Sequence, residues 1–471
     1  MAEPGMSPAP PASQIRRYYV LAALCFVPTL FFYYVGEEAV FTLNSIEMWQ
    51  RQEFINTVMY GALGGGGNGR PPLFNWLMIP LAHLMGWNHI LVASRIITVC
   101  ATVGTSMTAA WLSYQLWRNK SIAWMSALLY LLTADVLLYR GWVSYADPLF
   151  SMFVVLAIAL TWGACLRSSY WLLAGAVLAA FAALLTKAMT VYVFLGICWL
   201  VLLTQADYRR FLLRWQAWFL YALALLLPLL WFKLGSQDVD QQATLFRDVA
   251  EKLTVPQWRE YLVRLMSFPV EMFLRLMPAS VFITYVLWRQ HRTDEATPPA
   301  VRLALWMVVL NFLPYWLAPS GGARYVLPIY ALLALPAAYF AVHQFAHLAV
   351  QKWVVGLITL AIATNLVVYP YYQKKVRGEN YARMAKHIVH QHGNFPLYAT
   401  NVSSVGLAVV AHIGSMRHTQ PALVWPPADF KHGVVIAHSE SDVVGTLIGK
   451  LQIDNDAVVL ICRGDACPEP R

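Results

Sequence analysis

Long apolar segments follow one another along most of this chain, and they constrain its fold more than any other feature. Each is roughly 17 to 25 residues long, enough to cross the hydrocarbon core of a bilayer as a helix. Hydrophobic residues make up 59% of the 471 residues and charged residues 12%, about half the fraction usual in soluble domains. The sequence therefore predicts an α-helical polytopic membrane protein. We place about eleven spans, at residues 17–35, 90–117, 121–140, 148–166, 170–186, 188–204, 217–234, 270–289, 301–318, 324–346 and 353–371.

Basic residues favour one orientation of these spans. With the N-terminus in the cytoplasm, every expected inner connection carries a positive charge, as the positive-inside rule requires. Residues 1–16 are rich in Pro and Ala and are predicted to be disordered. The first span lacks a small-residue cleavage site, so we expect it to be retained as a signal anchor. Residues 17–371 are then the transmembrane domain, with residues 36–89 as its first extracytoplasmic loop.

The tail, residues 372–471, has a different character from the rest of the chain. It contains seven of the twelve histidines and mixes polar with apolar residues. Residues 381–391 are expected to form a helix, and residues 397–399, 433–437 and 457–461 short strands. The tail therefore predicts a small α/β domain outside the cytoplasm. Cys462 and Cys467 lie close together in it and could form a disulfide in an oxidising compartment; a metal pair is the weaker alternative.

The first outer loop, Gly36 to Arg70, carries an acidic pair, Glu37-Glu38, directly after an apolar span. Its far end is Gly-Arg-Pro-Pro, Gly69 to Pro72, and the short apolar segment Leu73 to Met85 that follows is expected at the membrane interface. A charged group at the face of a bilayer is costly unless it is paired or acts on a ligand. We interpret this loop as the centre of an active site on the non-cytoplasmic side.

Three further polar positions fall on the same predicted face: Asp147 before Pro148, Lys187 between two short spans, and Arg324-Tyr325 at the start of a span. Each has a simpler explanation. Asp147 could only cap a helix, Lys187 could extend its amine to the interface, and Arg324 could anchor a lipid headgroup. The acidic pair could be solvated loop charge. The combination on one face is what favours an active site.

The sequence offers little support for a site that binds a nucleotide, a metal ion or a nucleic acid. The glycines at 61, 64–67 and 69 are not followed by Gly-Lys-Ser/Thr, so a nucleotide-binding loop is not indicated. His387, His390 and His392 fit a surface helix better than a metal site. The net charge of +10 suits anionic lipids or phosphate-bearing substrates, and no compact basic domain points to nucleic acid.

At these positions the chain resembles the bacterial GT-C glycosyltransferases that use polyprenyl-phosphate sugars, the superfamily of lipid A aminoarabinose transferases and protein O-mannosyltransferases. The resemblance covers roughly residues 17–345. The family has an acidic pair, usually Asp-Glu, where Glu37-Glu38 stands, and a basic residue before prolines, usually Lys, where Arg70 stands. Arginine keeps the charge and can bind phosphate bidentately. Further matches are Ala146-Asp147-Pro148, Leu185-Thr186-Lys187 and Arg324-Tyr325-Val326-Leu327-Pro328.

The resemblance implies a GT-C fold in a bacterial inner membrane and inverting sugar transfer from a polyprenyl-phosphate donor. An extracytoplasmic acceptor, lipid A, lipopolysaccharide or another envelope glycan, would attack the sugar, and the lipid phosphate would leave. The catalytic group would comprise Glu37, supported by Glu38, and Asp147, which orients the acceptor or a cation. The donor phosphate would bind Arg70, Lys187 and Arg324, and Tyr325 would line the sugar pocket. Some members of the family use a divalent cation, so the resemblance leaves a metal open.

Other functions stay open from the sequence. A protein acceptor would make the chain an O-glycosyltransferase, and a polymerase or O-antigen ligase would use the same lipid-linked donors. A lipid-linked sugar transporter or flippase belongs to a different class. It would be expected to carry internal repeats and charges near the bilayer midplane. The sequence shows no internal repeat and gathers its charges at one face, which favours an enzyme.

Overall fold

The computed structural model describes residues 11–55, 57, 71–187, 189–235, 257–293, 297–376, 380–400, 402–453 and 456–467. The chain divides into two compact units. We call the first the helical unit; it comprises Met1–Val27, Thr98–Trp142 and Ala146–Asn365. The second, the mixed unit, comprises Pro28–Ile97, Val143–Tyr145 and Leu366–Arg471. The tail thus belongs to one unit with the first predicted outer loop.

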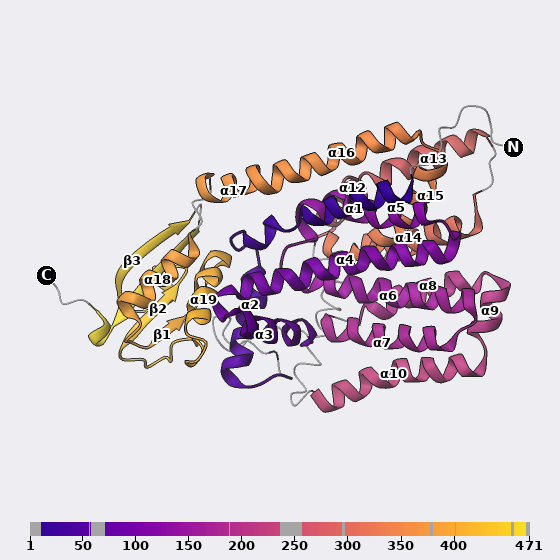
Figure 1. Cartoon of the computed structure of the whole chain (residues 1–471). Coiled ribbons are helices and arrows are strands. Elements are labelled where there is room, and N and C mark those ends of the chain that lie inside the picture. The colour runs from indigo at the N-terminus through magenta and orange to yellow at the C-terminus, as the bar shows by residue number, and fades with distance from the viewer. Residues whose placement is uncertain are drawn as a thin grey trace. The chain divides into compact units, whose positions relative to one another are not determined.

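The helical unit is built from the long apolar segments (Figure 1). Its helices are α1 (Ala12–Leu24), most of α4 (Ile90–Trp117), α5 (Lys120–Leu131), the π-helical turn η3 (Val136–Arg140), α6 (Ala146–Arg167), α7 (Tyr170–Thr186), α8 (Val191–Leu203), α9 (Ala206–Leu212), α10 (Trp215–Gly235), α12 (Trp258–Arg275), α13 (Ala279–Thr293), α14 (Pro299–Leu317), η4 (Ala323–Val326), α15 (Leu327–His343) and α16 (His347–Ala363).

Six helices in the described residues are long and apolar enough to cross a membrane, or seven if a bent pair counts as one span. The bent pair, α12 and α13, corrects the continuous span expected at 270–289, because the two helices meet at an angle of 101°. Pro278 separates them, and proline disfavours a helical residue before it and offers no N–H to the helix. Several expected spans appear as shorter apolar helices, among them α7 and α8. The total of eleven stays a prediction.

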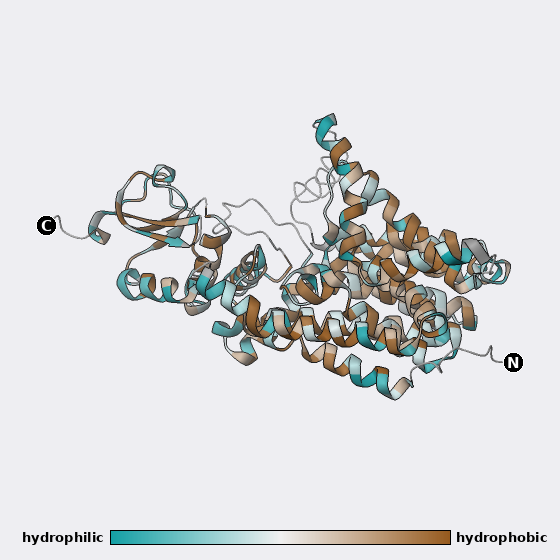
Figure 2. Ribbon diagram, turned by 90° about the horizontal axis from the view of Figure 1, so that it is seen from above, coloured by the Kyte–Doolittle hydropathy of each residue, from teal (hydrophilic) through white to brown (hydrophobic). Residues whose placement is uncertain are grey.

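Burial separates the central helices of this unit from the peripheral ones. The apolar window of α15 is 89% buried and that of α6 is 72% buried, whereas α10 is 11% buried. A helix that is apolar all round lies in a core or faces lipid. Figure 2 shows this composition as largely brown helices throughout the unit. We therefore interpret α15 and α6 as the protein core of the bundle and α10 as a lipid-facing helix.

A helical hairpin sets the geometry of the predicted site. α6 and α7 pack along each other and are joined by Ser168 and Ser169 alone. Because so short a connection makes the two helices antiparallel, the start of α6 and the end of α7 lie at the same end of the hairpin. Asp147 is in the first turn of α6, and Lys187 follows the last residue of α7. Two positions 40 residues apart are thereby brought together.

The mixed unit combines short helices with one sheet. Its elements are η1 (Pro28–Phe31), α2 (Glu38–Arg51), α3 (Leu73–Met85), η2 (Trp87–His89), the first turns of α4, α17 (Tyr369–Tyr371), η6 (Tyr372–Val376), α18 (Tyr381–His392), β1 (Leu397–Ala399), α19 (Ser404–Met416), β2 (Gly433–Ala437), η7 (Glu440–Asp442), β3 (Thr446–Ile453), β4 (Asp456–Arg463) and η8 (Gly464–Ala466).

The sheet has the strand order β1-β2-β4-β3. β1 and β2 are parallel, which requires a crossover connection, and α19 lies in that connection. β4 runs antiparallel to both of its neighbours. The sequence predicted α18 and the strands β1, β2 and β4 to within two residues at each end, but neither α19 nor β3. A disulfide joins Cys462, at the end of β4, to Cys467.

α19 connects the sheet to the segment that follows the first apolar run. A Cβ atom on Gly414 would lie 3.3 Å from Ile46 of α2, so the two helices approach closely. The imidazole of His412 contacts the ring of Tyr34 edge-on, with 5.2 Å between ring centroids. Burial lowers the pKa of His412 to about 4, so its side chain is neutral at pH 7. α2 therefore packs against α19, a helix of the tail.

Candidate active site

The two residues of the acidic pair have opposite environments. Glu37 is exposed, whereas Glu38 begins α2 with a fully buried side chain. The backbone N–H of Glu37 donates a hydrogen bond to the hydroxyl of Tyr145, at 3.1 Å. Because the first residue of a helix and the residue before it point in different directions, neighbouring acids can serve separate purposes. Glu37 is the exposed member of the pair, and Glu38 presents its carboxylate to the protein.

Both carboxylate oxygens of Glu38 are occupied by protein donors. Oε1 accepts from Arg95 Nε at 2.9 Å and from the N–H of Ser144 at 2.6 Å. Oε2 accepts from Arg95 Nη2 at 2.6 Å and from the N–H of Val35 at 2.7 Å. A buried carboxylate is tolerated when it is paired and fully hydrogen-bonded. Glu38 therefore fixes the backbone just before the acidic pair, at Val35, and the backbone at Ser144.

Arg95 is a residue of this site that the sequence interpretation missed. Its guanidinium is fully buried and makes five hydrogen bonds, one for each of its N–H groups. Three of them go to the carbonyls of Thr29, Phe32 and Tyr33, which lead from the first apolar run to the acidic pair. A signal was available, because Arg95 is the one charged residue of the apolar run 90–117 and such residues need a partner.

The second polar cluster lies in the helical unit, where Lys187 Nζ donates to Asp147 Oδ1. The side chains are 13% and 6% exposed, so the ion pair is largely removed from water. Such a pair costs desolvation energy unless it has additional partners or a function. The structure thus brings these two positions into direct contact.

An aromatic ring and a second cation complete this cluster. Lys187 Nζ lies 4.3 Å from the centroid of the Tyr325 ring, and the guanidinium carbon of Arg324 lies 5.2 Å from the same centroid. The negative face of an aromatic ring attracts cations at such distances. Asp147, Lys187, Arg324 and Tyr325, four of the residues predicted from the sequence, are thus gathered from α6, α7 and η4. A carboxylate beside two cations can bind an anion and orient a hydroxyl.

Arg70 lies outside the described residues, as do the glycines around it. In the parts of the chain that are described, no group of three or more His, Cys, Asp or Glu side chains is placed to hold a metal ion.

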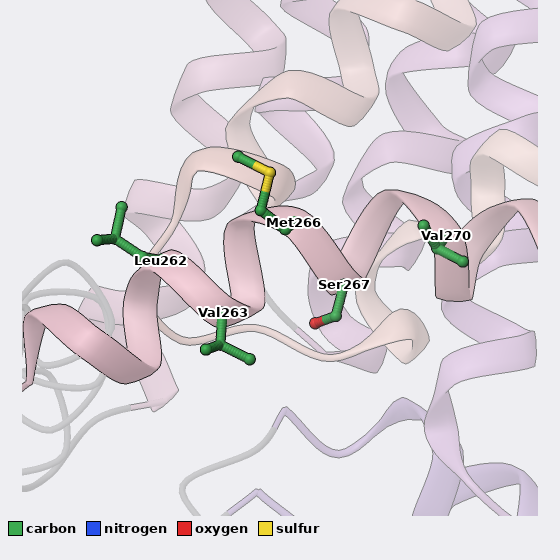
Figure 3. A pocket seen from close by; sticks show the side chains of 5 residues that line it. All are labelled: Leu262, Val263, Met266, Ser267 and Val270. Carbon is green, nitrogen blue, oxygen red and sulfur yellow. The ribbon is translucent and has the colours of Figure 1, made fainter.

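A surface hollow on α12 does not have the composition of a reaction site. Leu262, Val263, Met266, Ser267 and Val270 line it, all from one helix (Figure 3). The four apolar side chains are between 55% and 68% exposed. This lining offers no charged group to bind a phosphate or to move a proton, and an exposed apolar face on a membrane protein is suited to lipid.

Comparisons with known proteins bear on the fold. No family model and no curated protein matches the sequence. The structure is similar to that of ArnT from Cupriavidus metallidurans bound to undecaprenyl phosphate, with a TM-score of 0.66 and 12% identity over 98% of this chain and 100% of that one. The apo form of ArnT gives a TM-score of 0.66 and 13% identity, with 95% and 98% coverage. The oligosaccharyltransferase AglB from Archaeoglobus fulgidus is more distant, with a TM-score of 0.47, 13% identity, and 88% and 64% coverage.

The likeness to ArnT extends over nearly the whole of both chains, so it includes the apolar helices and the C-terminal sheet together. ArnT is a lipid A aminoarabinose transferase, a member of the group that the sequence resembles. Identity of 12–13% is evidence about fold. The chain therefore has the GT-C fold that its sequence predicted, in the form seen in ArnT.

Proposed function

We propose that this protein transfers a sugar from a polyprenyl-phosphate donor to an acceptor outside the cytoplasm. The observation that carries the proposal is the cluster of Asp147, Lys187 and Tyr325, a carboxylate and a cation against an aromatic ring, largely buried at the ends of apolar helices. A membrane protein retains such groups where they bind a ligand or form an essential pair. The ArnT structure of the same fold is bound to undecaprenyl phosphate, a ligand of the proposed donor's chemical class.

In the proposed reaction, an acceptor hydroxyl attacks the anomeric carbon of the sugar, and the bond from that carbon to the phosphate oxygen breaks. The acceptor proton passes to a carboxylate, and the bonding electrons leave with the lipid phosphate. Attack from the side opposite the leaving group inverts the anomeric centre. The step needs a general base, and it needs cations where the charge of the phosphate develops.

We assign Glu37 as the base, because it is the exposed member of the acidic pair. Lys187 and Arg324, with Arg70, are assigned to the donor phosphate. Asp147 orients the acceptor or a cation, and Tyr325 lines the sugar pocket. Aromatic rings suit this last role, since they present an apolar face with a polar hydroxyl at the edge.

Glu38 receives a supporting role in this proposal. Its carboxylate has four hydrogen bonds from protein donors, so it is a positioning residue for the segment that carries Glu37 and does not contact the acceptor. The acceptor that we favour is lipid A, lipopolysaccharide or another envelope glycan. This assignment places the enzyme in the bacterial inner membrane with its C-terminal residues outside the cytoplasm.

The test separates proton transfer from phosphate binding. Glu37→Gln keeps the size of the side chain but removes the base, so sugar transfer should fall about 10²–10⁴-fold while donor binding persists. Lys187→Ala removes a cation and should weaken both binding and transfer. The measurements are transfer from a synthetic polyprenyl-phosphate sugar and, separately, binding of the unreactive lipid phosphate. The matched control is Glu53→Gln, an exposed glutamate beyond the end of α2.

Near wild-type transfer by folded Glu37→Gln would show that Glu37 is not the base. If Lys187→Ala bound the lipid phosphate as tightly as the wild type, the assignment of this cluster to the donor would be wrong. If the wild-type protein neither bound the lipid phosphate nor transferred the sugar, the proposed function itself would fail.

A further inference from the structure

A third polar cluster in the helical unit has no role in the reaction as described so far. It is centred on Asp135, whose side chain is 2% exposed. Oδ1 accepts from Arg275 Nη1 at 2.6 Å. Oδ2 accepts from Arg140 Nε at 2.9 Å and from the hydroxyl of Tyr330 at 2.8 Å. One buried carboxylate, in the turn before η3, therefore binds three residues, one each from η3, α12 and α15.

The segments that meet at Asp135 lead to the residues of the proposed donor site. Arg140 ends η3, and Asp147 follows seven residues later at the start of α6. Tyr330 lies in the first turn of α15, directly after the η4 turn that carries Arg324 and Tyr325. The backbone adds a further tie, since the N–H of Ala134 donates to the carbonyl of Met277 at 2.9 Å. The Asp135 cluster is thus connected along the chain to both sides of the donor site.

The hydrogen bond from Arg140 is not required to satisfy the Asp135 carboxylate. If Arg140 were absent, Arg275 would still serve Oδ1 and Tyr330 would still serve Oδ2. Arg140 donates to Asp135 through Nε alone. Its guanidinium carbon lies 5.7 Å from the centroid of the Tyr139 ring. Within the described residues, its two terminal amino groups make no hydrogen bond. A guanidinium held through Nε keeps these two groups in a fixed orientation, which is the arrangement that binds phosphate bidentately.

The burial and surroundings of Arg140 agree with a role in binding phosphate. Its side chain is 12% exposed, much like the 13% of Lys187. Arg140, Lys187 and Arg324 all lie near enough to the Asp147 carboxylate to interact with it electrostatically. Arg140 also pairs with Asp135, so these three cations face two carboxylates, and the positive charge that remains suits a phosphate.

We propose that Arg140 binds the phosphate of the lipid-linked donor alongside Lys187 and Arg324, and that Asp135 is the positioning residue that fixes its guanidinium. The inference rests on the proposed function and adds two residues to it. Neither residue could be singled out from the sequence, since an Asp and an Arg five residues apart form an ordinary pair until their further partners are known.

The experiment uses the full chain in lipid nanodiscs, with undecaprenyl phosphate as the probe for binding and the polyprenyl-phosphate sugar for transfer. Arg140→Gln should weaken binding of the probe about 10- to 100-fold, the loss expected for a charge-assisted hydrogen bond. Arg140→Lys should recover part of it, because the charge remains. The control is Arg167→Gln, at the far end of α6 roughly 30 Å from Asp147, which should bind as the wild type does.

A double-mutant cycle tests the role of Asp135. Asp135→Asn should weaken probe binding in the wild-type background but add little in the Arg140→Gln background, because its effect acts through Arg140. Equal losses in both backgrounds would show that Asp135 is only structural and would overturn its positioning role. Unchanged binding by folded Arg140→Gln, while Lys187→Ala binds weakly, would overturn the inference and leave the proposed function standing.

A measurement on the wild-type protein covers the case in which Arg140→Gln does not fold. Phenylglyoxal modifies accessible arginines, and peptide mass spectrometry identifies those modified. Undecaprenyl phosphate should protect Arg140 and leave the modification of Arg167 unchanged. Equal modification of Arg140 with and without the lipid phosphate, under conditions where binding is measured directly, would overturn the inference.

Discussion

The ion pairs Glu38–Arg95 and Asp147–Lys187 both lie beside apolar segments, yet they differ in how fully the protein occupies them. Both side chains of the first pair are 0% exposed, and its carboxylate accepts four hydrogen bonds. In the second pair, which is 6% and 13% exposed, the carboxylate has one side-chain donor in the described residues, Lys187. The first pair has no capacity left for a ligand, whereas the second retains it.

Burial alone therefore does not identify a catalytic carboxylate. The number of hydrogen-bond donors distinguishes the carboxylates of Glu38 and Asp147. Each hydrogen bond from a fixed protein donor stabilises the carboxylate, and it also removes a site at which a substrate could bind. We therefore expect substitutions in the first pair to change mainly stability, and substitutions in the second to change mainly catalysis.

The largest effect should come from Asp147→Asn. The amide keeps the shape of the side chain but loses the charge that orients the acceptor or a cation beside Lys187, so sugar transfer should fall about 10²–10⁴-fold. The melting temperature should change less than it does for the Glu38 variant below, because asparagine can still accept from Lys187. The measurements are the transfer rate and thermal unfolding of the same preparation. A variant that unfolds readily but transfers sugar normally when folded would reverse the assignment.

Glu38→Gln should have the next largest effect, on stability. Glutamine brings an NH2 group to a site whose four neighbours are all donors, and it leaves the Arg95 guanidinium buried without a counter-charge. Breaking a buried pair in this way costs about 3–5 kcal/mol. The free energy of unfolding in mild detergent should fall by that amount. Unchanged stability would mean that this pair is not the structural element inferred here.

The smallest effect should follow from loss of the disulfide in the mixed unit. Cys462 and Cys467 are five residues apart, and a loop this short contributes about 2 kcal/mol in the chain-entropy account. Cys462→Ser with Cys467→Ser should lower the melting temperature and leave transfer per folded molecule unchanged, since the pair is remote in sequence from Asp147 and Lys187. Thiol alkylation of the unfolded, non-reduced wild type should spare both cysteines. Labelling of both would exclude the disulfide in the native protein.

Much of this architecture follows from the sequence alone. Apolar runs predicted many of the helices, and the orientation of those runs placed Asp147 and Lys187 at one predicted face. Helical and alternating patterns predicted α18, β1, β2 and β4. These features depend on neighbours along the chain, and hydrophobic periodicity records such neighbours directly.

Tertiary contacts decided what the sequence left open. Nothing in Glu37-Glu38 shows which residue is buried, because the answer depends on Arg95, a residue 57 positions away from Glu38. The edge strand β3 contains Gly449 at a register irregularity, so pairing with β4 rather than intrinsic propensity makes it a strand. The role of Asp135 depends on its hydrogen bonds with Arg275 and Tyr330, which lie 140 and 195 positions away along the chain. Partners so distant along the chain meet only when the helices pack, and a single sequence does not record that meeting.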